Sequence, residues 1–284
     1  MTDLPPVRLI ATDLDGTLLR PDKTVGRATR TALRGAADAG LFVTAATGRQ
    51  PGTIPVDLLD CGVRYLVGAN GAIGVDQCTD EILFERDLSA EAVAALSAFV
   101  HENIPEGRIS VARDHGRRYL VEPGYKELVY SWETVPLSYL FEADPAEVAD
   151  GPTIKLTVRH PSLTADELQA IVDAQHIPGC HTTTSGAPFL EVSGAGVNKA
   201  TGLELLCEHL GVDAVAVMAF GDAANDLEML SWVGRSVAMG NASDEVKAVA
   251  RQVTATNTED GVGKAVEALL AERRQRWNRP ATPS

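Results

Sequence analysis

The stretch Val7-Arg8-Leu9-Ile10-Ala11-Thr12-Asp13-Leu14-Asp15-Gly16-Thr17 decides the fold. Its first half is a mainly apolar run typical of a buried strand, and the run ends in two carboxylates and a glycine. Open parallel sheets bind ligands beyond the carboxyl ends of their strands. Asp13 and Asp15 would share one face of a continuing strand, but a turn at Gly16 lets them point differently into one crevice. The stretch therefore predicts a ligand site, or else a polar turn in which an aspartate caps its own backbone.

Short apolar runs alternate with helical patterns around this stretch, as in parallel β-α-β units. Strands are predicted at 7–12, 41–46, 65–67, 215–220 and 237–239. Helices are predicted at 24–39, 54–59, 199–210 and 226–233, and a last helix extends to about residue 277. The alternation predicts an α/β domain built on a parallel sheet.

The pattern changes between residues 84 and 189. The runs 108–113 and 117–121 flank Asp114-His115-Gly116, a short turn of the kind that joins antiparallel strands. Thr164 and Glu167 have the spacing of a capping box, which marks a helix start. We therefore predict an α/β core domain made of residues 1–83 plus 190–284, interrupted by an α+β domain at 84–189.

Composition and charge exclude several classes of function. The 284 residues include 25 Lys/Arg and 39 Asp/Glu, and the net charge of −14 repels nucleic acid and anionic membrane surfaces. No run approaches the about 18 apolar residues of a membrane span. The N-terminus has no signal-peptide pattern, so we expect a cytoplasmic protein. The four cysteines show no close pairing, which predicts free thiols and no structural zinc site.

A second acidic cluster, Gly221-Asp222-Ala223-Ala224-Asn225-Asp226, follows another apolar strand. The carboxyl ends of neighbouring parallel strands meet at one edge of the sheet, so we expect both clusters to converge there. Adjacent carboxylates need either a hard cation such as Mg²⁺ or a proton on one of them. Asp222 is then a further metal ligand, and Asn225 is a donor for a bound anion.

Two more segments suit a phosphate group. Thr47-Gly48-Arg49 follows the predicted strand at 41–46 and offers a hydroxyl and backbone amides. Lys199 begins a predicted helix and supplies a compact positive charge. Taken singly, Thr47 is equally well a helix cap and Lys199 a solvated surface lysine.

The ordered set DLDGT at 13–17, ATGR at 46–49, Lys199 and GDAAND at 221–226 resembles the four motifs of the haloacid dehalogenase-like hydrolase superfamily. Asn70-Gly71-Ala72, the long insertion after it, and the run at 238–242 resemble the Cof-type branch, whose members carry a large α+β cap of type IIB. One departure is Asn198-Lys199-Ala200, where the family often has Ser-Lys-Gly. The resemblance implies a Rossmann-like parallel-sheet core in which the segment at 84–189 is the cap.

The same resemblance implies a Mg²⁺-dependent phosphatase of small phosphorylated metabolites. Asp13 would attack phosphorus to form an aspartyl phosphate, and Asp15 would act as general acid and base. Mg²⁺ would be held by Asp13, the Asp15 main-chain carbonyl and Asp222. The phosphoryl group would be held by Thr47, Gly48, Lys199 and Asn225. Supporting roles would fall to Asp226, Asn70 and Asn241.

Two other functions remain open from the sequence: a phosphotransferase of phosphomannomutase type, and a phosphometabolite-binding protein without turnover. Among substrates we expect sugar phosphates first and, as less favoured candidates, pyridoxal phosphate or flavin mononucleotide. In the cap, Arg113, His115, Arg117 and Arg118 either contact a second anionic group of the substrate or form an exposed charged turn.

Overall fold

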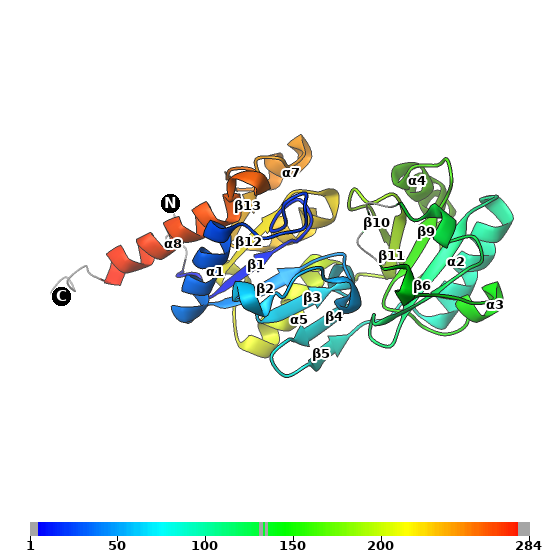
Figure 1. Ribbon diagram of the computed structural model, residues 1–284, viewed down its shortest axis with the longest axis horizontal. Helices are drawn as coiled ribbons and strands as arrows, with labels where there is room; N and C mark the ends of the chain where they lie inside the picture. Colours follow the sequence, from blue (N-terminus) through cyan, green and yellow to red (C-terminus); the bar gives the residue numbers. More distant parts are fainter. Residues whose placement is uncertain (1–4, 131–132, 134–135, 278–284) are drawn as a thin grey trace.

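The computed structural model describes residues 5–130, 133 and 136–277, which form two sheets with separate hydrophobic cores (Figure 1). The eight-stranded sheet has the order β14 (Gln252–Val253), β13 (Arg235–Ala238), β12 (Val217–Gly221), β1 (Leu9–Thr12), β2 (Phe42–Ala46), β3 (Tyr65–Gly68), β4 (Ile73–Asp76) and β5 (Glu81–Glu85). Its first six strands are parallel, and β4 and β5 form an antiparallel edge.

The helices of this sheet are α1 (Arg27–Asp38), α5 (Lys199–Leu210), α6 (Leu227–Trp232), α7 (Asp244–Val249) and α8 (Gly261–Trp277). Within the sheet, β2 lies on one side of β1, whereas β13 lies on the opposite side of β12. Because such crossovers are right-handed, α1 and α6 cover opposite faces of the sheet. In keeping with this, α1 packs on α8, and α5 packs on α6. The order reverses between β1 and β12, which is where sheets of this type bind ligands.

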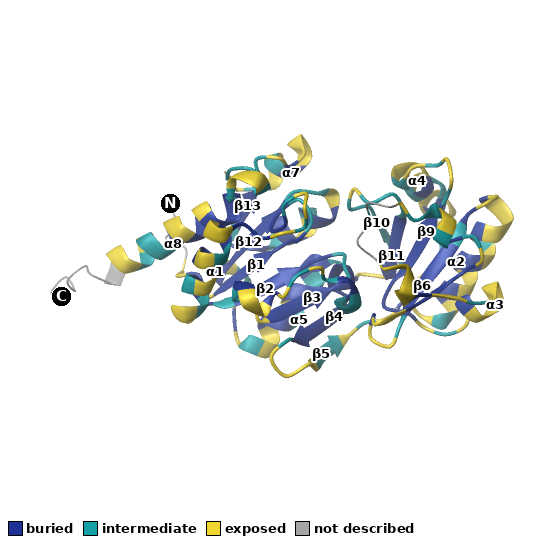
Figure 2. Ribbon diagram, in the orientation of Figure 1, coloured by how far each residue is buried: buried dark blue, intermediate teal, exposed yellow. Residues whose placement is uncertain are grey.

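The six-stranded sheet has the order β10 (Cys180–Thr183), β11 (Leu190–Gly194), β9 (Leu156–Arg159), β6 (Arg108–Arg113), β7 (Arg118–Val121) and β8 (Leu140–Glu142). Its helices are α2 (Ala90–Asn103), α3 (Pro145–Val148) and α4 (Ala165–Gln175). Apolar residues of α2 and α4 share one buried cluster with Leu156 and Val158 of β9. Figure 2 shows buried stretches along α2, β9 and β11. Since strand side chains alternate, Lys155, Thr157 and Arg159 lie on the other face.

Several local predictions are confirmed. β6 and β7 pair antiparallel, and α4 begins with a capping box in which Thr164 and Glu167 bond each other's backbone. Helix α5 ends at Gly211 in the left-handed conformation. The helix expected at 54–59 is wrong, because the structure has only short 3-10 turns at Pro51–Thr53 and Leu59–Cys61. Pro55 lies inside that segment and cannot supply a helical N–H.

The predicted α/β class with a parallel-sheet core is confirmed. The division at 84–189 remains a prediction, and strand pairing bears on its edges. β5 extends to Glu85 within the eight-stranded sheet, and Leu190–Gly194 pairs with β9 and β10 in the six-stranded one.

The four cysteines are free thiols. Within the described ranges, no helix combines the length and the apolar character needed to cross a bilayer.

Candidate active site

The two acidic clusters follow neighbouring strands of the eight-stranded sheet. β1 pairs with β12 in parallel, with Thr12 opposite Phe220, so Asp13 and Asp222 leave the sheet at the same edge. One carboxylate oxygen from each of Asp13, Asp222 and Asp226 lies within 4.8 Å of the others. The structure thus brings the three carboxylates together at the point where the strand order reverses.

Lys199 lies at the centre of this cluster and is fully buried. Its Nζ donates to Asp13 Oδ1 and to Asp226 Oδ1, each at 2.7 Å. Burial alone would lower the pKa of Lys199, but the two carboxylates outweigh burial and raise it. Asn198 caps the helix by accepting from the Thr201 N–H, so the altered residue before the lysine still starts α5. A solvated surface lysine is excluded.

Asp226 organises the loop that follows β12. Its Oδ2 accepts hydrogen bonds from the backbone N–H groups of Asp222 at 2.9 Å and Ala223 at 3.1 Å. Because its Oδ1 binds Lys199, both oxygens of Asp226 are already engaged by protein donors. Asp226 therefore positions its neighbours, and Asp13 and Asp222 are the carboxylates best placed for a metal ion.

Asp13 and Asp222 both carry raised pKa values. Burial is the main cause for Asp13, and the charge of Lys199 opposes it only in part. For Asp222, burial raises the pKa to about 6 against the opposing hydrogen bond from Thr17, whose Oγ1 lies 2.5 Å from Asp222 Oδ1. A raised pKa means that a carboxylate favours its protonated, neutral form. A nearby cation would stabilise the anionic forms of Asp13 and Asp222.

Gly16 makes room for Asp222. Its φ is +84°, and a Cβ at this position would lie 2.2 Å from Asp222 Oδ2. Asn241 Nδ2 donates to the Gly16 carbonyl at 2.8 Å and supports the same turn. The residues present therefore fit a hard divalent cation: oxygen donors, net negative charge and a backbone that approaches closely.

Asp15 points away from the acidic cluster. Arg49 binds both of its oxygens, and Lys23 Nζ lies 2.7 Å from Oδ1. Burial would raise the pKa of Asp15, but the two cations outweigh it and lower the pKa to about 2. With its carboxylate engaged in this way, Asp15 offers a metal ion only its main-chain carbonyl. Sequence reasoning assigned no role to Arg49, although it directly follows Thr47-Gly48.

The loop after β2 lies beside Asn70. Asn70 N donates to the Thr47 carbonyl at 2.9 Å, and Asn225 Nδ2 donates to Asn70 Oδ1 at 3.0 Å. Asn70 has a left-handed φ of 54°, which asparagine tolerates better than most residues. The Thr47 side chain accepts from Arg49 N at 3.1 Å. Hydrogen bonds thus link Thr47, Asn70 and Asn225 at the same edge as Asp13, and Gly48 follows Thr47 in the same loop.

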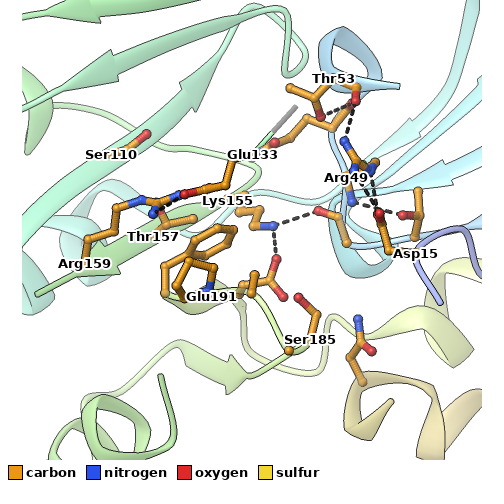
Figure 3. Close-up of a pocket in the computed structure, with 18 of the residues that line it drawn as sticks. Asp15, Arg49, Thr53, Ser110, Glu133, Lys155, Thr157, Arg159, Ser185 and Glu191 are labelled. Atoms are coloured by element: carbon orange, nitrogen blue, oxygen red, sulfur yellow. Dashed lines mark hydrogen bonds and ion pairs between the residues drawn. The ribbon is translucent and has the colours of Figure 1, made fainter. Parts of the chain in front are cut away.

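A cavity of about 210 Å³ lies between the two sheets (Figure 3). From the eight-stranded side it is lined by Asp13, Asp15, Thr47, Gly48, Arg49 and Asn225. From the six-stranded side it is lined by Ser110, Lys155, Thr157, Arg159, Phe189 and Glu191. Sequence reasoning missed this second set. Apolar and polar residues alternate over 153–159, and a strand that places Leu156 and Val158 on one face places 155, 157 and 159 on the other.

The charges on the six-stranded side are paired. Lys155 forms an ion pair with Glu191, and Arg159 Nη1 donates to Glu133 Oε1 at 2.9 Å. The Arg159 guanidinium also lies 4.5 Å from the ring centre of Phe189. All four charged side chains are almost fully buried. This wall of the cavity is therefore polar with balanced charges.

Of the two alternatives for the β6–β7 turn, the structure favours the exposed charged turn over a contact to a second anionic group of the substrate. Arg113 donates to the main-chain carbonyl of Pro152 at 2.7 Å, His115 pairs with Glu85, and Arg117 Nη2 lies 2.5 Å from Asp80. None of these side chains lines the cavity. Their charges are satisfied on the protein surface, as in an exposed charged turn.

Comparison with known proteins places the chain in a family. Residues 10–266 match the family model described as haloacid dehalogenase-like hydrolase. A protein named HMP-PP phosphatase, from Yersinia pseudotuberculosis serotype I (strain IP32953), is 35% identical over 242 residues, which cover 84% of this chain and 86% of the relative.

Two solved structures share this fold over most of the chain. A sugar phosphatase of haloacid dehalogenase subclass IIB has a TM-score of 0.81 and 27% identity, covering 92% of this chain and 98% of its own. A phosphatase of the same superfamily from Bacteroides thetaiotaomicron has a TM-score of 0.79 and 25% identity, covering 93% and 95%. The chain therefore belongs to the haloacid dehalogenase-like hydrolases, in their Cof-type branch, and is a phosphatase.

Proposed function

We propose that the protein is a Mg²⁺-dependent phosphatase that cleaves small phosphate monoesters through an aspartyl phosphate on Asp13. The observation that carries the proposal is the placement of Asp13. Its carboxylate is buried at the cavity floor, with Oδ1 on the Lys199 ammonium and the Asp222 carboxylate close by. Among the described residues, Asp13 Oδ2 accepts no hydrogen bond, which leaves it as the nucleophilic oxygen.

The first half of the reaction transfers the phosphoryl group to the enzyme. Asp13 Oδ2 attacks phosphorus in line with the ester oxygen, the ester P–O bond breaks, and the leaving alkoxide takes a proton from Asp15. Lys199, the Thr47 hydroxyl, the Gly48 N–H and the Asn225 amide hold the phosphoryl oxygens. Mg²⁺, held by Asp13, the Asp15 carbonyl and Asp222, would supply charge neutralisation at the phosphoryl group.

The second half returns Asp13 to its starting state. A water molecule loses a proton to Asp15 as its oxygen attacks phosphorus, the bond to Asp13 breaks, and inorganic phosphate leaves. In this mechanism Asp15 must separate from its cations before it can carry a proton, since Arg49 and Lys23 together lower its pKa to about 2. The acid–base group is therefore anionic until the ion pair opens.

Sugar phosphates are the substrates that this cavity supports best. On the six-stranded side, Ser110 and Thr157 offer hydroxyls, and the charges there are balanced between Lys155 with Glu191 and Arg159 with Glu133. An uncharged, hydroxyl-bearing leaving group matches such a wall better than a second anionic group does. A similar structure is named as a sugar phosphatase, whereas the curated relatives are named HMP-PP phosphatases, so both substrate types belong in the test.

The test is phosphate release from a panel of sugar phosphates, HMP-PP, pyridoxal phosphate and flavin mononucleotide, with Mg²⁺ or with chelator. We expect release to require Mg²⁺ and to fall about 10³-fold or more in Asp13→Asn, which lacks the nucleophile. Asp76→Asn is the matched control. Asp76, in β4, is as buried as Asp13, but it pairs with Arg64 and does not line the cavity. Wild-type rates in Asp13→Asn would refute the mechanism, and isomeric products without free phosphate would indicate a mutase.

A further inference from the structure

A side chain from the six-stranded side contacts the loop after β2. Lys155 Nζ donates to the Gly48 carbonyl oxygen at 2.7 Å and forms an ion pair with Glu191 of β11 (Figure 3). The side chains of Lys155 and Glu191 are only 5% and 3% exposed. The contact is thus a charge-assisted hydrogen bond shielded from water, the kind that fixes geometry most strongly.

Gly48 is enclosed from both sides. A Cβ at this position would lie 3.1 Å from Asn70 Oδ1 and 3.1 Å from Glu191 Oε1. The backbone of the loop is therefore held between a residue of the eight-stranded half and an ion pair of the other half. Its position depends on both.

We propose that Lys155 is a positioning residue that orients the Thr47 hydroxyl toward the phosphoryl group. The Gly48 carbonyl and the Arg49 N–H belong to one planar peptide unit, so fixing the carbonyl fixes the N–H. That N–H donates to Thr47 Oγ1 at 3.1 Å. With a lone pair of Oγ1 occupied, the hydroxyl hydrogen is directed elsewhere as a donor. The inference rests on the proposed function, in which this donor binds phosphate.

The Lys155–Glu191 pair suits a positioning role better than a stabilising one. Glu191 Oε2 is buried and has no hydrogen-bond partner among the described residues. A buried ion pair with an unsatisfied oxygen contributes little more to folding stability than an apolar pair of similar volume does. The contact with Gly48 gives the pair a role that an apolar pair would not fill.

The test measures binding of inorganic phosphate by titration calorimetry in the presence of Mg²⁺. The double variant Lys155→Met with Glu191→Leu removes both charges together, so that neither is left buried alone. We expect its phosphate Kd to rise on the order of 10-fold, as for the loss of a hydrogen bond to a charged group. KM should rise by a similar factor for p-nitrophenyl phosphate and for a sugar phosphate, because the phosphoryl group is common to both.

The matched control is Arg159→Met with Glu133→Leu. This pair also contains a cation of the β9 segment and lines the same cavity. Arg159, however, contacts the Leu128 carbonyl and the rings of Tyr125 and Phe189 and not the loop after β2. We expect its phosphate Kd to stay within about twofold of wild type.

Two outcomes would overturn the proposal. If the Lys155/Glu191 variant keeps the wild-type phosphate Kd and loses only sugar-phosphate affinity, Lys155 binds the leaving group. If both double variants weaken phosphate binding equally, the effect is general disruption of the cavity. Phosphate binding needs no turnover, so these results are independent of whether Asp13→Asn abolishes phosphate release.

Discussion

Arg49 binds both carboxylate oxygens of Asp15, with Nε 2.5 Å from Oδ2 and Nη2 2.8 Å from Oδ1. Arg49 belongs to the same loop that Lys155 contacts through Gly48, so one short segment touches both the proposed phosphate site and the proposed acid–base residue. In this arrangement Asp15 has no proton to give. The proposed mechanism therefore requires the Arg49–Asp15 ion pair to open before the leaving group departs.

Arg49→Met is expected to raise the pKa of Asp15 above its wild-type value of about 2, because burial then acts with only Lys23 opposing it. The ion pair stabilises the folded protein above the unfolded-state pKa of 3.8 and loses its effect as the pH falls toward 2. The stability deficit of the variant should therefore shrink between about pH 4 and pH 2.

The measurement is an NMR titration of ¹³Cγ-labelled aspartates in the metal-free protein, with Asp15→Asn to assign the signal. Arg64→Met is the control, since it removes the partner of Asp76 and should leave the Asp15 titration unchanged. An Asp15 pKa that stays near 2 in Arg49→Met would show that Lys23 alone sets it.

Lys199→Met is expected to destabilise the fold by about 3–5 kcal/mol, because it leaves Asp13 and Asp226 buried without their shared cation. Urea denaturation checks this. Lys23→Met is the control, because Lys23 is one-third exposed and such pairs contribute about 1 kcal/mol or less. Added Mg²⁺ should restore part of the loss in Lys199→Met. Equal effects of the two substitutions would contradict the central position of Lys199.

Mg²⁺ binding is expected to weaken as the pH falls below about 6. The pKa of Asp222 is raised to about 6 by burial, with Thr17 opposing, and that of Asp13 is raised as well. A proton on either carboxylate must leave before the ion binds, so affinity falls up to tenfold per pH unit for each proton displaced. Calorimetry at pH 7.5 and pH 5.0 measures the difference, with Asp222→Asn as the variant without a site. An affinity that does not change with pH would contradict the prediction.

The parallel core was predictable because its signals are local. β1, β2 and β12 are short buried apolar runs, and each is followed directly by polar residues. Other elements lacked such signals. β4 and β5 form an antiparallel edge whose register shifts after Gly74, and no pattern in the sequence specified it. The expected helix at 54–59 followed apolar spacing alone and neglected Pro55.

Some residues of the site were predictable from local sequence signals, and others were not. Asp13, Thr47 and Asp222 follow strand ends, so parallel topology alone brings them together. The six-stranded wall depends on pairing between distant segments: Lys155 meets Glu191 36 residues away, and Arg159 meets Glu133 26 residues away. Charged residues in a strand are typical of a solvated face. Here Lys155 is covered by Gly48 of the loop after β2, and Arg159 is covered by the rings of Tyr125 and Phe189 of its own half.

Gly16→Ala tests whether the turn after Asp15 is needed for the metal site or only for the fold. A Cβ at Gly16 would lie 2.2 Å from Asp222 Oδ2, so this carboxylate or the turn would have to shift. Gly40→Ala is a matched control, because Gly40 has a similar φ of +79° but nothing within 4 Å of the added Cβ.

Both substitutions place alanine in the left-handed region, which costs about 1 kcal/mol. We expect Gly40→Ala to lose only this stability and to bind Mg²⁺ as wild type does. Gly16→Ala should lose more stability and should also weaken Mg²⁺ binding at least tenfold, as measured by calorimetry at pH 7.5. If Gly16→Ala binds Mg²⁺ normally, the Asp222 carboxylate is not held in place by this turn, and the ion must be bound by other oxygens.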